Sequence, residues 1–471
     1  MSEIFCPDPC DEIAAHLLRD EPALLSSAGF GDFVRQGAGP GPALLVGDQS
    51  EIPLLRTAPL SRFDHRMALL ARPGDMVAVR RRDRGFEDYL KHILGLADIA
   101  FIETEAHGPA PAAAQIRLSP PLLEACVDLC KRHRGLTLTP YLTTGHVWRL
   151  AQAIGQGAGR PVHVNGPTPR AARRANDKLW FADLARRVIG GEATPPTFAA
   201  FGPAAAAGLV ARIGRSADQV IVKVPDSAGS AGNIRLPSAA VRHLPLAALR
   251  WFLLARLRAT GWRDVYPLLV GVWDAHVTHS PSVQMWLPHL DQGPPRIEGI
   301  FEQRVQGTAA TFVGARRSPL PRALQDRIGA EALRIAAVLQ RIGFFGRCSF
   351  DAVLCHGGKG GAAIHWIECN GRWGGVSIPM TALGRLVPGE RDRAMLIVQE
   401  ILPRDPRPVT WMVEVLDDLL LRPGQTEGGI GILSPPPHAE GFSANLAAIA
   451  ESDDAAERMM QTALDRLATG T

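Results

Sequence analysis

The stretch from Phe344 to Met380, FFGRCSFDAVLCHGGKGGAAIHWIECNGRWGGVSIPM, decides how the chain is interpreted. It predicts two β-strands joined by a glycine-rich turn. Asp351 lies on the first strand, and Glu368 and Asn370 lie near the end of the second. Because side chains two residues apart on a strand point to the same face, Glu368 and Asn370 share a face, and the hairpin can bring Asp351 beside them.

Such a cluster holds only hard oxygen ligands, without histidine or cysteine. This ligand set suits Mg²⁺, with Mn²⁺ as an alternative. Arg372 follows directly, and its planar guanidinium can meet a phosphate or an oxyanion. The competing interpretation is an ordinary hairpin, because Asp and Asn are common at strand ends and turns.

A second signal lies at Val220–Asn233, VIVKVPDSAGSAGN, where a short apolar strand ends in Lys223. The loop after it is rich in glycine and serine, which can turn backbone N–H groups and hydroxyls toward an anion. It is not the G-x-x-x-x-G-K-[ST] loop, because its lysine precedes the glycines. The candidate phosphate contacts in this loop are Ser227, Gly229, Ser230 and Gly232.

Two further segments carry weaker signals. Asn176 is predicted to cap a helix that opens at Lys178, although a plain helix start explains this segment as well. The apolar strand SVQMWL, residues 282–287, runs into a turn-rich segment and is predicted to form a hinge that offers backbone groups to a flat base. The residues expected there are Gln284, Met285, Trp286 and Leu287.

The order of these motifs resembles that of the ATP-grasp superfamily over residues 165–385. The resemblance is carried by Lys178, Lys223, the loop from Asp226 to Asn233, the 285–287 hinge and the Asp351…Glu368-x-Asn370-x-Arg372 hairpin. The layout is similar to that of the peptide-forming ligases of the pheganomycin type. It departs from many members at the hinge, where Gln284 stands near the position of an acidic residue.

The resemblance implies an ATP-dependent carboxylate–amine ligase. Lys178 and Lys223 would hold the α- and β-phosphates, and Asp351, Glu368 and Asn370 would bind Mg²⁺. A small-molecule carboxylate would attack the γ-phosphate to give an acyl phosphate. An amine, from an amino acid or a peptide, would then displace phosphate, with Arg372 as the catalytic donor to the oxyanion. A small-molecule kinase and a non-catalytic nucleotide-binding protein remain as alternatives.

The expected fold is of the mixed α/β class with an ATP-grasp core. Strands alternate with helices over residues 1–165, which predicts a parallel sheet. This block resembles the Rossmann-like domain that precedes many ATP-grasp cores. The lid is expected at 166–275, the metal and catalytic subdomain at 276–385, and an extra C-terminal α+β block at 386–471. Within that block, residues 386–402 are interpreted as helical and residues 409–421 as a strand.

Composition limits the partners. The 471 residues are 46% hydrophobic and 21% charged, with a net charge of +4, which predicts no nucleic-acid partner. No apolar run approaches the ~20 residues that a membrane helix needs, and the acidic, proline-interrupted start of the sequence is not expected to be a signal peptide. Seven cysteines, an odd number, argue against a disulfide framework. These features predict a cytoplasmic protein and leave a homodimer open.

Overall fold

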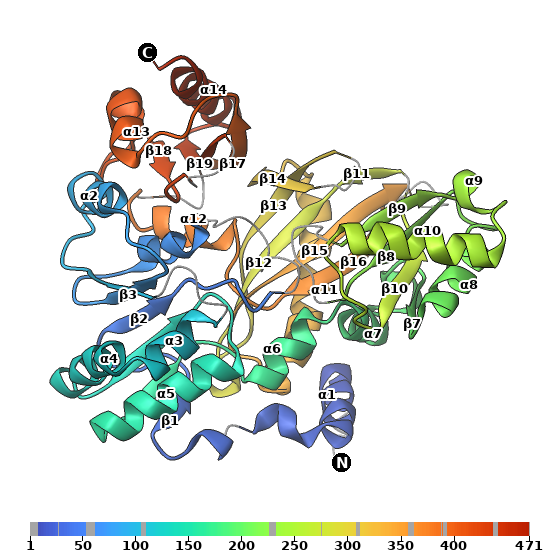
Figure 1. The fold of residues 1–471 in the computed structure, drawn as a ribbon, viewed down its shortest axis with the longest axis horizontal. Helices are drawn as coiled ribbons and strands as arrows, with labels where there is room; N and C mark the ends of the chain where they lie inside the picture. The colour runs from blue at the N-terminus through green and yellow to red at the C-terminus, as the bar shows by residue number, and fades with distance from the viewer. Residues whose placement is uncertain are drawn as a thin grey trace, which may run out of the picture.

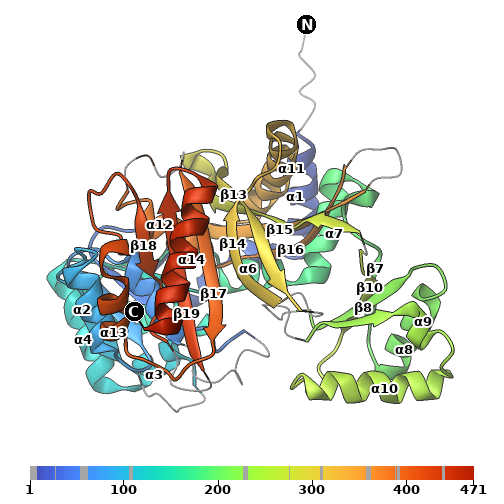
Figure 2. The same cartoon turned by 90° about the horizontal axis from the view of Figure 1, so that it is seen from above.

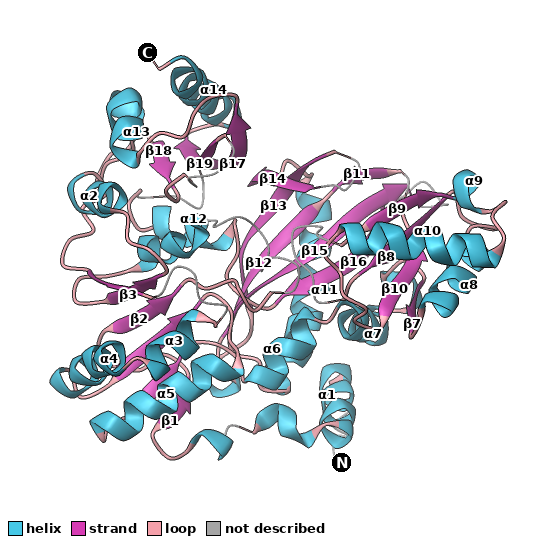
Figure 3. Ribbon diagram, viewed as in Figure 1, coloured by secondary structure: helices cyan, strands magenta, loops and turns pink. Residues whose placement is uncertain are grey.

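A computed structural model describes residues 8–26, 28–52, 62–104, 110–225, 232–274, 276–307, 311–356, 362–387, 389, 393–436 and 441–470. In these residues the chain forms one parallel sheet and two antiparallel sheets, each flanked by helices (Figure 3). The predicted mixed α/β class is confirmed.

The N-terminal sheet has six strands in the order β1-β6-β5-β2-β3-β4, and every neighbouring pair is parallel. All residues of the third and fifth strands are buried, as expected where helices cover both faces of a parallel sheet. The strands are β1 (Val34–Gln36), β2 (Ala43–Val46), β3 (Met76–Val79), β4 (Ala100–Glu103), β5 (Leu136–Pro140) and β6 (Val162–Val164). The helices are α2 (Arg84–His92), α3 (Ala112–Leu118), α4 (Pro120–Arg132) and α5 (Gly145–Ala158).

A small antiparallel sheet in the order β7-β10-β8-β9 lies in the part of the chain expected to form the lid, and we call it the lid sheet. It stands apart from the rest of the molecule in Figure 2. Its buried residues make a separate apolar core, including Val222, Leu253 and Val270. The strands are β7 (Thr197–Ala200), β8 (Gln219–Lys223), β9 (Ile234–Pro237) and β10 (Leu268–Val272), and the helices are α8 (Pro203–Ile213), α9 (Ser238–Val241) and α10 (Leu246–Ala259).

The largest sheet has nine strands, ordered β11-β15-β12-β13-β14-β17-β19-β18, with β16 paired to β15 (Figure 1). Its strands are β11 (Val277–His279), β12 (Pro281–Leu287), β13 (Arg296–Gln306), β14 (Thr311–Arg317), β15 (Gly346–His356), β16 (Ala362–Asn370), β17 (Ala394–Leu402), β18 (Gly429–Ile432) and β19 (Phe442–Ala450). The remaining helices are α1 (Pro9–Asp20), α6 (Pro169–Asn176), α7 (Lys178–Ile189), α11 (Arg322–Arg341), α12 (Ser377–Leu383), α13 (Val409–Leu416) and α14 (Asp453–Thr469).

The apolar cores join some segments that the predicted domain boundaries separate. Helices α1, α7 and α11 share one core with the hairpin, through Leu17, Phe181, Ile335 and Phe350. The 166–189 segment therefore belongs with the large sheet, although residues 166–275 were expected to form the lid. The strands β17, β18 and β19 extend the same large sheet and share a core with α2 of the N-terminal domain. The C-terminal block is therefore not a separate layer.

Two secondary-structure predictions in the C-terminal block are wrong. Residues 394–402 form strand β17, because the run MLIV is apolar on both faces and pairs with β14 and β19. Residues 409–416 form helix α13, in which Val409, Met412 and Leu416 are buried at helical spacing. The run VTWMVEVL is rich in β-branched residues, which are common in strands, and tertiary packing selects the helix. Among the described helices, none has both the length and the apolar character needed to cross a bilayer.

Candidate active site

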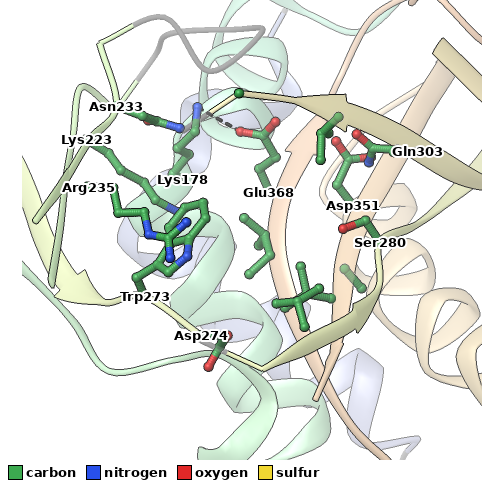
Figure 4. Close-up of a pocket in the computed structure, with 16 residues that line it drawn as sticks. Lys178, Lys223, Asn233, Arg235, Trp273, Asp274, Ser280, Gln303, Asp351 and Glu368 are labelled. Carbon is green, nitrogen blue, oxygen red and sulfur yellow. Dashed lines mark ion pairs between the residues drawn. The ribbon is translucent and has the colours of Figure 1, made fainter. Parts of the chain in front are cut away.

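A cavity of about 390 Å³ lies between the lid sheet and the large sheet (Figure 4). Its volume is in the range of small-molecule sites. Cations come from the lid side and from the start of α7, and carboxylates come from the hairpin of β15 and β16. The lining residues are Lys178, Lys223, Asn233, Arg235, Trp273, Asp274, Val277, Ser280, Gln303, Val305, Gly307, Asp351, Ala352, Val353, Ile367 and Glu368.

The hairpin has the geometry that its sequence predicts. Strands β15 and β16 pair antiparallel, with Asp351 opposite Glu368 and Ser349 opposite Asn370. A register shift follows directly after Asp351, where Ala352 pairs with Trp366, so that β16 carries one extra residue. The Asn370 Nδ2 donates to Asp351 Oδ2 at 3.0 Å. The three predicted oxygen ligands are therefore neighbours.

The pKa values of the two carboxylates in this cluster shift in opposite directions. Burial and the negative charge of Glu368 raise the pKa of Asp351. Burial also disfavours the charge on Glu368, but neighbouring cations, led by Lys178, hold the pKa of Glu368 below its usual value. Two carboxylates opposite each other disfavour each other's ionisation, and Lys178, Arg372 and Lys223 supply the positive charge that keeps Glu368 ionised. The donor set, two carboxylates and an amide oxygen, fits a hard divalent cation such as Mg²⁺.

Lys178 reaches the hairpin from the first residue of α7. Its Nζ lies 2.8 Å from Glu368 Oε2 and donates to the carbonyl of Pro225 at 3.2 Å. Helix α7 begins here because the Asp177 side chain accepts hydrogen bonds from the backbone N–H groups of Leu179 and Trp180. The prediction that Asn176 caps this helix is wrong, because Asp177 directly precedes the first residue of α7 and holds the N-cap position, whereas Asn176 is the last residue of α6.

Asn176 instead connects α6 to the turn after β16. Its Oδ1 accepts hydrogen bonds from the Gly371 backbone N–H at 3.1 Å and from the Arg372 guanidinium. The other arm of Arg372 donates to Asn370 Oδ1 at 2.6 Å. The guanidinium is thus held between two amide oxygens, beside the acidic cluster.

The second predicted lysine also faces the cavity. Lys223 ends β8, and burial lowers its pKa to about 8 although Glu368 opposes the shift. In the loop that follows, Ser227, Gly229 and Ser230 lie outside the described residues. Gly232 lies within them, buried at the end of the loop with φ +77°, a conformation that favours glycine.

The prediction that residues 284–287 form the hinge is wrong. They lie inside the large sheet, where β12 pairs with both β13 and β15, and Met285 and Leu287 are fully buried. None of the four is among the described residues that line the cavity. Gln284 instead supports the acidic cluster indirectly, because its Nε2 donates to Ser282 Oγ at 2.9 Å and that hydroxyl bonds Asp351 Oδ1 at 2.6 Å.

The chain passes between the two sheets after β10, through Trp273 and Asp274, and both residues line the cavity. Arg235 lies over the Trp273 ring, with 5.4 Å from its guanidinium carbon to the ring centroid. Sequence reasoning missed Arg235, Trp273, Asp274, Ser280 and Gln303. The one available signal was the end of an apolar run, LLVGV, immediately before Trp273 and Asp274.

Comparison with known proteins agrees with this architecture. A model of the pre-ATP-grasp domain matches residues 64–156. No curated protein matches the sequence significantly. An ADP complex of N5-carboxyaminoimidazole ribonucleotide synthetase superposes with a TM-score of 0.55 at 11% identity, covering 91% of this chain and 97% of the other. Biotin carboxylase from Campylobacter jejuni, in a β-γ-ATP complex, superposes with a TM-score of 0.54 at 14% identity, covering 93% of this chain and 92% of the other.

A third similar structure is the biotin carboxylase domain of 2-oxoglutarate carboxylase from Hydrogenobacter thermophilus, a dimer with MgADP, ADP and bicarbonate. It has a TM-score of 0.52 and 15% identity, and the match covers 91% of this chain and 90% of that one. Such low identities establish the shared fold and leave the substrates open. Residues 64–156 therefore match the pre-ATP-grasp domain, and the chain shares the ATP-grasp fold of these structures, with its cavity between the lid and the acidic hairpin.

Proposed function

We propose that the protein is an ATP-dependent ligase that joins a carboxylate to an amine through an acyl phosphate. One observation carries the proposal: a single cavity places Lys178 and Lys223 opposite the Asp351 and Glu368 carboxylates. A polyphosphate with a divalent cation has this pattern of charge, with negative oxygens for the lysines and a positive ion for the carboxylates. The similarity to nucleotide-bound ligases and carboxylases of the same fold supports ATP as the nucleotide.

In this proposal, Lys178 and Lys223 contact the α- and β-phosphates. The segment 226–233, of which only residues 232 and 233 are among the described residues, is expected to contact the β- and γ-phosphates. Asp351, Glu368 and Asn370 would hold Mg²⁺, or Mn²⁺ in its place, which neutralises charge on the phosphates when bound. Trp273 offers an indole face to the base. This assignment replaces the 284–287 contact, because Trp273 lines the cavity and those residues do not.

The protein needs no nucleophile of its own for this reaction. A carboxylate oxygen attacks the γ-phosphorus and ADP leaves, and the amine nitrogen then attacks the acyl carbon, loses a proton and expels phosphate. Arg372, held by Asn176 and Asn370, can donate to the oxygen that becomes negative in the second step. We further propose that the amine is an amino acid or a peptide, with a specificity similar to that of the pheganomycin-type ligases. The proposal also includes a cytoplasmic location and a homodimer.

The decisive experiment measures ADP release with a panel of carboxylates and amines. A ligase releases ADP and phosphate in equal amounts only when both substrates are present. A kinase would instead give a stable phosphorylated product without an amine. ATP binding without turnover for any pair in the panel would favour a non-catalytic nucleotide-binding protein.

Replacing Trp273 with alanine is expected to weaken ATP binding about 5- to 150-fold. The reason is that stacking of a base on an aromatic ring contributes about 1–3 kcal/mol. Calorimetric titration with ATP measures the effect. The matched control is Trp251→Ala, which removes an indole that is 60% exposed on α10 of the same lid and should leave the affinity unchanged. Equal losses in the two variants would remove Trp273 from the base site.

The affinity for ATP is expected to fall as the pH rises above about 8, because the pKa of Lys223 is about 8 in the free protein. A bound phosphate raises that pKa, so the complex holds more protons than the free protein above pH 8, and binding then requires proton uptake. Below pH 8 the Lys223 amine is already charged in the free protein, so binding takes up no proton and the affinity no longer changes with pH through this group. Titrations with ATP across this pH range should show an affinity that falls with pH in the wild type. The affinity should change less in Lys223→Arg, because the guanidinium stays charged. A wild-type affinity independent of pH would contradict the role of Lys223.

A further inference from the structure

A second cluster of side chains lies at the edge of the cavity and takes no part in the proposed ligase chemistry. Asp274, Cys355 and His365 each bring one ligand atom within 4.8 Å of the other two, and all three side chains are half-buried. They come from the lid linker after β10, from β15 and from β16. Three different donor types, a carboxylate oxygen, a thiol sulfur and an imidazole nitrogen, thus meet at one point.

The strand register explains why they meet. His365 pairs with Val353 and Cys355 pairs with Ala363, so Cys355 and His365 are diagonal neighbours on one face of the hairpin. Strand β11 pairs with β15 at Val277 and Cys355, which draws the linker containing Asp274 against the hairpin. Cys355 is four residues beyond Asp351 on β15, so the Cα atoms of these two residues are about 13 Å apart along the strand.

The ligand chemistry separates this cluster from the acidic one. Thiolate and imidazole prefer Zn²⁺ and similar softer cations, whereas Mg²⁺ takes oxygen ligands alone. Bonds of about 2.0–2.3 Å to a tetrahedral Zn²⁺ put neighbouring ligand atoms about 3.4 Å apart. The Asp274 Oδ2 and His365 Nδ1 atoms lie 2.9 Å apart, and no pair in the cluster exceeds 4.8 Å, so small side-chain rotations suffice.

The protons on this cluster are the ones that a metal ion would displace. The hydrogen bond to Asp274 raises the pKa of His365, which favours the protonated imidazolium. Burial, together with the charge of Asp274, raises the pKa of Cys355 to about 11, so the thiol keeps its proton at neutral pH. Binding of a divalent cation to these groups therefore releases protons.

We propose that Asp274, Cys355 and His365 form a binding site for a Zn²⁺-class cation, with a fourth position open to water. The site links the two parts of the molecule that enclose the cavity, because Asp274 follows the last lid strand while Cys355 and His365 belong to the large sheet. An ion bound there would restrain the linker that joins the lid to the large sheet. This inference does not depend on the ligase reaction.

Cobalt(II) titration of the full chain tests the site, with excess Mg²⁺ present to occupy the oxygen cluster. One equivalent of Co²⁺ should produce a near-ultraviolet thiolate-to-cobalt band, and one equivalent of Zn²⁺ should remove it. Cys355→Ser should lose the band, and His365→Gln should weaken Co²⁺ binding more than about tenfold. The control, Cys10→Ser, changes a buried thiol on α1 and should keep the band.

The absence of the band in the wild-type protein would overturn the proposal, as would a band that survives in Cys355→Ser. If Cys355→Ser does not fold, His365→Gln decides, because unchanged Co²⁺ affinity in that variant contradicts the site. ADP release does not enter any of these readouts, so the result stands whether or not the protein is a ligase.

Discussion

Replacement of Glu368 by glutamine is expected to abolish turnover and to leave the fold intact. Glu368 faces Asp351 across the hairpin and lies 2.8 Å from Lys178 Nζ, so it stands where the proposed phosphate-binding and cation-binding parts of the cavity meet. The neutral amide has nearly the same size, which preserves the strand register. It removes one of two negative charges from the proposed Mg²⁺ ligands, and Mg²⁺ depends on such charge for binding.

The measurement is ADP release over a wide range of Mg²⁺ concentration, with a thermal unfolding curve to verify the fold. The matched control is Glu331→Gln on α11, whose carboxylate accepts a hydrogen bond from Trp366 Nε1 at 3.0 Å, away from the cavity. This control should cost some stability and keep the activity. Glu368→Gln activity near that of the wild type at saturating Mg²⁺ would refute the metal assignment.

Arg372→Ala is expected to lose amide formation by about 10²–10³-fold while binding ATP almost normally. The guanidinium bonds the Asn176 and Asn370 side chains, a geometry that prepares it for charge that develops during transfer. The surrounding turn should survive, because Gly371 N–H still donates to Asn176 Oδ1. Arg372→Lys should recover little, since an ammonium cannot bond both amide oxygens with the same fork.

Nucleotide affinity and product formation are measured side by side for both variants. Arg327→Ala, on the exposed side of α11, provides the control for loss of an arginine. If ATP affinity falls in step with product formation, Arg372 acts on the nucleotide or on the structure, and its proposed role at the oxyanion is incorrect.

The hairpin could be predicted because its information is local. Asp351, Glu368 and Asn370 lie within 20 residues, and the period of a strand fixes which side chains share a face. The parallel N-terminal sheet was predictable for a similar reason, since short apolar strands alternate with helices. The hinge was not, because an apolar run such as SVQMWL fits both a linker and a central strand, and pairing with β13 and β15 decides between them.

Other parts of the site depend on contacts between distant residues. Asn176 and Arg372 are 196 positions apart, and no pattern near either residue indicates that they meet. Arg235 and Trp273 reach the cavity only because β9 and β10 belong to one sheet. A single aromatic or basic residue carries no periodic signal, so the lid side of the site required the structure.

The separate apolar core of the lid has a thermodynamic consequence. Because the buried residues of β7–β10, α8 and α10 pack among themselves, this unit can unfold locally while the large sheet stays intact, at a lower free energy than global unfolding. Any ligand that requires both walls of the cavity must then close that local opening. At a hundred times its dissociation constant it would add about 2.7 kcal/mol. Amide hydrogen exchange should record this added protection in the lid strands, and least in the parallel sheet around β5.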